Sequence, residues 1–129
     1  MKPDNKISVS IVTPEKNIFE GETDFVLVPA LNGALGMLPG HMPIIAKLST
    51  GIVKIGKAGD VRYFAIQGGY IEFLFNRADI MTMYAIETSY GERDRVLKEM
   101  KKKYKIVQEV TEETKKVAHA MTHIKDLKN

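Results

Sequence analysis

The chain has 129 residues, which is enough for one domain with a substantial core and no stabilising cross-link. It contains no cysteine, which excludes a disulfide framework, a thiolate nucleophile and a cysteine metal site. Residues 1–86 carry 8 basic and 8 acidic side chains, whereas residues 87–129 carry 11 and 8, so the second part holds the net charge of +3. This small surplus suits an acidic protein surface and falls short of the basic footprint that nucleic acid requires.

The first part alternates short apolar runs with glycine and proline, a pattern typical of strands joined by turns. About six to eight strands at this spacing indicate a β-sandwich or flattened barrel over residues 1–86. The expected strands are Lys6–Thr13, Asp24–Pro29, Met42–Leu48, Gly51–Ile55, Val61–Gln67, Tyr70–Phe75 and Ile80–Ile86.

The second part has the composition of helices. After Gly91 the chain contains neither glycine nor proline, and helix-favouring residues dominate. Ser89 and Glu92 have the spacing of a capping box, and an apolar stripe follows at helical spacing. Thr111 is placed to cap a second helix, so residues 87–129 are expected to form a helical hairpin. Each helix alone is marginal in water, so the hairpin must pack on itself, on the sandwich or on a partner.

Few residues suggest catalysis or a bound cofactor. His119 and His123 are four residues apart, but no third metal ligand follows at a matching spacing, which favours a polar helix face. His41 has no acidic neighbour in the sequence, and the chain has no P-loop or nucleophile elbow. We therefore predict no catalytic residue, no metal ligand and no cofactor. The chain also has no signal-peptide pattern and no bilayer-spanning apolar stretch, so we expect a soluble protein that could still sit on a membrane complex.

Two segments are candidate contact surfaces. Asn32–Ile45 gathers glycine, proline and His41 around apolar residues, which fits either a constrained turn or a loop that exposes apolar side chains to a partner. The first expected helix is strongly basic, which fits either a solvated face or a docking surface for an acidic partner. The residues alone leave both questions open.

The run Gly33–Ile45 resembles the G-x-L-G-hydrophobic-x-P-G-H-x-P-hydrophobic signature of the epsilon subunit of F-type ATP synthases. Val9–Pro14 and Phe19–Gly21 are similar to the family's opening strand and the turn after it. Gly68–Phe73 is similar to its Gly-Gly-hydrophobic-hydrophobic-Glu-hydrophobic strand. The resemblance implies a ten-stranded β-sandwich in residues 1–86, followed by a two-helix antiparallel hairpin in residues 87–129.

The resemblance further implies a non-catalytic rotor subunit of the central stalk, at the cytoplasmic face of the bacterial plasma membrane. The sandwich would bind the gamma subunit and the c-subunit ring, and the hairpin would restrain ATP hydrolysis at the catalytic alpha and beta subunits. No homo-oligomer and no nucleic acid would be involved. The implied ring-facing residues are Ala34, Met37, Leu38, Gly40, His41 and Met42. The implied inhibitory contacts to the beta subunit are Arg93, Arg95, Lys98, Lys101 and Lys102.

The chain departs from the family pattern at two places. Ala34 stands where some members carry an acidic residue implicated in ring contact. The Ile-Asp-x-x-Arg-Ala motif through which some bacterial members bind ATP is absent from Glu87–Val96, and the second expected helix has no arginine. The missing motif and the missing arginines both argue against ATP binding by the hairpin. The competing interpretation is a free-standing ligand-binding sandwich with a helical oligomerisation tail; an enzyme that uses His41 is the weakest alternative.

Overall fold

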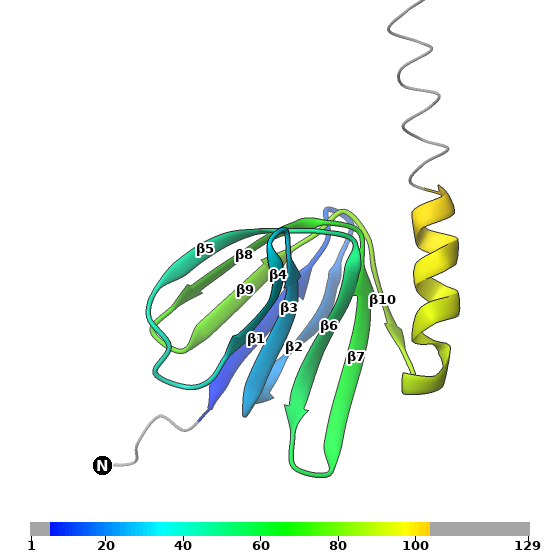
Figure 1. Ribbon diagram of the computed structural model, residues 1–129. Helices are drawn as coiled ribbons and strands as arrows, with labels where there is room; N and C mark the ends of the chain where they lie inside the picture. The colour runs from blue at the N-terminus through cyan, green and yellow to red at the C-terminus, as the bar shows by residue number, and fades with distance from the viewer. Residues whose placement is uncertain (1–5, 104–129) are drawn as a thin grey trace, which may run out of the picture.

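The computed structural model describes residues 6–103, in which ten strands, a short 3-10 helix and an α-helical segment follow one another (Figure 1). No helix within this range is long and apolar enough to cross a membrane. The strands are β1 (Ile7–Val12), β2 (Asn17–Thr23), β3 (Phe25–Ala30), β4 (Gly33–Met37), β5 (Ile44–Leu48), β6 (Gly51–Lys57), β7 (Asp60–Ile66), β8 (Gly69–Leu74), β9 (Arg77–Met81) and β10 (Ala85–Thr88).

The strands form one continuous sheet that folds into two layers. Their order is β10-β7-β6-β3-β5-β8-β9-β1-β2, and β4 pairs with β3. β3 and β5 share a single register pair, Ala30 with Leu48, and the sheet turns there from one layer into the other. The layers meet again where the rings of Phe19 on β2 and Phe64 on β7 lie 5.5 Å apart. This arrangement confirms the expected ten-stranded β-sandwich.

The core lies between the two layers and is almost entirely apolar. On β1 the side chains of Ile7, Val9 and Ile11 point inward and are fully buried, as the alternation in the sequence predicts. Phe64 and Phe73 are the largest fully buried side chains and come from opposite layers. Each such side chain contributes about 1.5–3 kcal/mol of transfer free energy, so the described sandwich holds a sufficient core of its own.

The observed strands differ from the expected ones at three places. β2 and β4 occupy segments that were expected to be turns. The expected strand Ile80–Ile86 is interrupted, because β9 ends at Met81 and β10 begins at Ala85. Between them the chain crosses from β8 and β1 in one layer to β7 in the other, and Gln67 N donates a hydrogen bond to Tyr84 O at the crossing. β10 continues to Thr88, two residues beyond the expected domain boundary.

The helical part begins with the 3-10 helix η1 (Tyr90–Glu92) and continues as an α-helix through residues 93–103, beside β10 (Figure 1). The expected capping box does not form, because the Ser89 side chain makes no capping bond. Instead, Glu92 N donates to Ser89 O at 3.1 Å, which closes the tighter 3-10 turn. The second expected helix, with Thr111, His119 and His123, lies outside the described residues.

Candidate partner-binding surfaces

The segment expected to face a partner ring is part strand and part loop. Ala34 and Met37 lie on β4, where they pair with Pro29 and Val26 of β3. Ala34 is exposed, but the Met37 side chain is only 1% exposed and belongs to the core. The side chain of Met37 is thus unavailable to a partner, and the exposed loop begins at Leu38.

The loop after β4 presents apolar side chains to solvent. Leu38 is 65% exposed and Met42 is 71% exposed. His41 N donates to Leu38 O at 3.0 Å, and the His41 ring packs edge-on against Phe73 with 5.5 Å between centroids. His41 Nδ1 lies 2.7 Å from Met42 O, and no carboxylate contacts this ring among residues 6–103. His41 therefore shapes the loop and has no acid–base partner there.

The turn between β8 and β9 lies against this loop. Gly40 N donates to Asn76 Oδ1 at 2.7 Å, which brings Phe75 to the same end of the sandwich. Phe75 is 89% exposed. We call Leu38, Met42 and Phe75 the tip. Sequence reasoning missed Phe75 because the expected strand Tyr70–Phe75 included it as the last residue. The apolar run of this strand continues past the end of β8 into a two-residue turn, and that continuation is the signal that could have identified Phe75.

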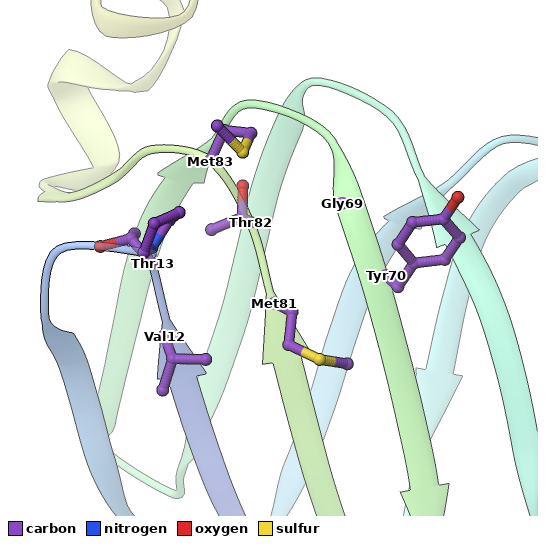
Figure 2. Close-up of a pocket in the computed structure, with 8 residues that line it drawn as sticks. Val12, Thr13, Gly69, Tyr70, Met81, Thr82 and Met83 are labelled. Atoms are coloured by element: carbon purple, nitrogen blue, oxygen red, sulfur yellow. The ribbon is translucent and has the colours of Figure 1, made fainter.

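A second apolar surface lies on the outer face of the layer formed by β5, β8, β9, β1 and β2. Val12, Met81 and Tyr70 occupy neighbouring register positions on β1, β9 and β8 and line a groove of about 400 Å³ (Figure 2). Met83, in the segment that follows β9, also lines the groove and is 71% exposed. We call Val12, Tyr70, Met81 and Met83 the side groove. The solvent-facing side of a sheet layer is normally polar, so this apolar row is a candidate protein-binding surface.

The same outer face continues toward the tip. Ile45 and Leu74 line a second hollow of about 350 Å³ between β5 and β8. Glu72 also lines this second hollow and stands opposite Asp79 on β9, and like charges in this position are destabilising. Asp79 is paired with Arg77 at 3.1 Å, whereas Glu72 has no ion-pair partner in the described part of the chain. The face thus combines apolar hollows with one acidic position free to meet a cation.

Comparison with known proteins identifies the sandwich. Residues 6–88 match the family described as the beta-sandwich domain of the ATP synthase delta/epsilon chain. The chain belongs to this family.

The curated relatives that match are ATP synthase epsilon chains. The chain is 38% identical over 78 residues to the ATP synthase epsilon chain of Leptospira interrogans serovar copenhageni, covering 60% of this chain and 61% of that protein. It is 38% identical over 79 residues to the epsilon chain of Halalkalibacterium halodurans, covering 61% and 57%. The match therefore spans about three fifths of the length of these relatives.

Solved structures share the fold. A chain of the Euglena gracilis mitochondrial ATP synthase, in a structure of OSCP/F1/c-ring, has a TM-score of 0.63 at 19% identity, with coverage of 77% of this chain and 66% of that chain. A chain of the Tetrahymena thermophila mitochondrial ATP synthase central stalk/c-ring has a TM-score of 0.54 at 18% identity, with coverage of 66% and 69%.

In this delta/epsilon-family chain, the arginines of the helix contact neighbouring side chains, whereas its lysines form no ion pair among residues 6–103. Arg93 stacks over the Tyr90 ring at 3.9 Å and reaches the Tyr63 ring at 5.5 Å, and its Nε donates to Tyr90 O at 2.9 Å. Arg95 pairs with acidic residues one turn away on either side, Glu92 at 3.4 Å and Glu99 at 3.1 Å. Four lysines are exposed and form no ion pair among residues 6–103: the predicted contacts Lys98, Lys101 and Lys102, and their neighbour Lys103.

An ion pair ties the last strand to the sandwich just before the helical part. Arg62 on β7 donates two hydrogen bonds of 2.8 Å to the Glu87 carboxylate on β10. The Arg62 guanidinium also lies over the Phe19 ring at 4.8 Å, so it links β10 to β2 in the other layer. These hydrogen bonds hold the pKa of Glu87 below its ordinary value, while partial burial acts in the opposite direction.

We expect the Arg62–Glu87 pair to give a small stability increment that depends on pH. Because the pKa of Glu87 is lower in the folded state, the increment is complete above the unfolded pKa of about 4.3 and disappears as pH falls through the folded pKa. Both side chains are half-exposed, so Glu87→Gln should cost about 0.5 kcal/mol at pH 7. Urea unfolding of the original chain and Glu87→Gln at pH 7 and pH 3 measures this difference in unfolding free energy. A difference as large at pH 3 as at pH 7 would contradict a stabilising role of the ionised Glu87.

Proposed function

We propose that this chain is a non-catalytic central-stalk (rotor) subunit of an F-type ATP synthase that couples ion translocation to ATP synthesis. The observation that carries the proposal is a family sandwich with two separate apolar surfaces, one at its end and one on its side. A stalk subunit must hold two neighbours at once, and two such surfaces suit that task. The chain works at the cytoplasmic face of the bacterial plasma membrane as a peripheral part of the complex.

Each surface fits a different partner. The side groove, with its methionines and the acidic Glu72 nearby, binds the gamma subunit. The tip, together with Ala34, Gly40 and His41, faces the c-subunit ring. The exposed lysines of the helix lie toward an acidic surface of a catalytic beta subunit, within the alpha/beta head, and restrain ATP hydrolysis. ATP is not expected to bind the helical part, because the arginine-containing motif is absent from Glu87–Val96.

The proposal is tested by mixing the purified chain with the gamma subunit of the same organism and separating the mixture by gel filtration. A stable one-to-one complex is expected. If gamma and this chain elute separately, the stalk assignment is wrong. Self-association without gamma, together with saturable binding of a small molecule, would instead support the free-standing ligand-binding module.

Charging the side groove should weaken gamma binding. Met81→Glu places a carboxylate at the centre of the apolar row, and an interface that buries it must desolvate an unpaired charge. We expect the dissociation constant for gamma to rise about tenfold or more. Val61→Glu, at a comparably exposed apolar position on β7 in the other layer, is the matched control and should leave the affinity unchanged. Equal losses in both variants would show that the groove is not the contact.

A further inference from the structure

The turn that carries Phe75 has an unfavourable backbone for that residue. Phe75 and Asn76 connect β8 to β9, and their φ angles are +48° and +57°. Positive φ at both positions of a two-residue hairpin turn defines type I′, in which Asn-Gly or Asp-Gly is preferred. Asn76 suits this geometry, but a bulky side chain at left-handed φ is a clear outlier, because its Cβ crowds the backbone. The sequence of the turn thus opposes the observed conformation at Phe75.

The fold gives Phe75 nothing in return. Its side chain is 89% exposed, and it makes no aromatic or cation contact among the described residues. A large apolar side chain left in water gains none of the transfer free energy that burial provides. Strain without an internal contact to offset it is typical of a position that is kept for a function.

Hydrogen bonds hold the turn that carries Phe75 in place. Asn76 Oδ1 accepts from Gly40 N at 2.7 Å, and Asn76 O accepts from Ser8 N at 2.9 Å. These bonds couple the turn both to the loop that carries Leu38 and Met42 and to the start of β1. Phe75 is therefore displayed from a supported turn, which lowers the entropy lost when a partner encloses it.

The charges at this end favour a protein partner over a lipid surface. Anionic membranes attract clusters of basic residues beside apolar ones. At this end of the described sandwich the basic residues do not cluster, because each lies beside an acidic one. Lys6 forms an ion pair with Asp24 and Arg77 with Asp79, Lys57 stands opposite Asp60, and the acidic Glu22 stands opposite Ser8, next to Arg77. A rim of mixed charge around an apolar centre matches the anatomy of a protein–protein contact.

We infer that Phe75 is a hydrophobic anchor, which inserts into an apolar recess of the protein bound at the tip, with Leu38 and Met42 as flanking contacts. The identity of that protein as the c-subunit ring rests on the proposed function. The anchor is kept at the expense of the stability of the free chain, so binding and stability respond to its removal in opposite directions.

Two substitutions separate the anchor from a structural role. Phe75→Asn removes the ring and places a residue that tolerates left-handed φ, whereas Phe75→Tyr keeps both the ring and the strain. The full-length chain in complex with gamma is titrated with the detergent-solubilised c-subunit ring, and the free chains are unfolded thermally. We expect Phe75→Asn to melt about 4 °C higher and to bind the ring about tenfold or more weakly, while Phe75→Tyr matches the original chain.

Each other result has a defined meaning. Equal ring affinity of Phe75→Asn and the original chain would overturn the anchor while leaving the stalk assignment intact. Failure of the original chain to bind the ring would contradict the proposed function itself. A lower melting temperature of Phe75→Asn would show that the ring stabilises its own fold and would overturn the inference. Binding of the original chain to phosphatidylglycerol vesicles that Phe75→Asn abolishes would assign the tip to lipid instead.

Discussion

Gly69→Ala should destabilise the sandwich by about 3 kcal/mol or more. Gly69 begins β8 with a φ of +124°, a conformation that L-residues rarely adopt. A Cβ there would lie 2.0 Å from Met81 O and 2.9 Å from Thr82 Cα, and both are backbone atoms that cannot move aside alone. Relief requires β9 to separate from β8, which would also disrupt the Tyr70–Met81 pair of the side groove. Equilibrium urea unfolding measures the change.

Gly59→Ala is the matched control for this substitution. Gly59 also has positive φ, +81°, but no atom lies within 4 Å of the Cβ that alanine would add. It should therefore show the backbone strain alone, about 1 kcal/mol. The difference between the two variants isolates the collision with β9. If both variants lose the same small amount, the close approach of β8 to the segment after Met81 is not a constraint on the fold.

Deleting residues 89–129 should leave assembly intact and release ATP hydrolysis. β10 ends at Thr88, and the Arg62–Glu87 pair precedes the cut, so the truncated chain retains every strand of the sandwich. If the helical part restrains hydrolysis by an ordinary allosteric coupling free energy, its loss should raise ATPase activity of the reconstituted enzyme about fivefold or more. Activity is compared between enzymes reconstituted with the full and the truncated chain.

A narrower variant tests which residues of the helix carry the restraint. Replacing Lys98, Lys101 and Lys102 together by alanine removes three exposed charges that form no ion pair among residues 6–103, but keeps Lys103 and leaves Arg93 and Arg95 in their contacts with Tyr90 and Glu99. The triple variant should raise ATPase activity by much of the amount that truncation does. Unchanged hydrolysis after truncation would remove the regulatory role without touching the stalk role. A loss of gamma binding after truncation would show that the sandwich alone does not hold the complex.

The sequence predicted strands well where one face is buried. Ile7, Val9 and Ile11 alternate with polar residues, and the period of two identifies β1 directly. β4 was missed because Gly33–Met37 is rich in residues with low strand propensity; it forms through backbone pairing with β3. The interruption between β9 and β10 was missed because a continuous apolar run does not reveal where a chain changes layers. The count of ten strands followed from the family resemblance.

The candidate surfaces were only partly accessible to sequence reasoning. The Gly/Pro-rich segment drew attention to Leu38 and Met42, which the structure leaves exposed, but the segment gave no sign that Met37 points into the core. The side groove was missed because its residues come from three strands whose order depends on long-range pairing. Tyr70 and Met81 read as ordinary strand residues until the register places them side by side.

The parallel pairing of β1 with β9 has a consequence for how the chain acquires its structure. β1 contributes Ile7, Val9 and Ile11 to the core, yet one of its two neighbours is among the last strands to be synthesised. An antiparallel β1–β2 hairpin alone is marginal in water, so β1 becomes stably structured only after it pairs with β9. Such non-local pairing predicts refolding in milliseconds to seconds and a nascent chain whose first hairpin stays open until residues 77–81 emerge from the ribosome.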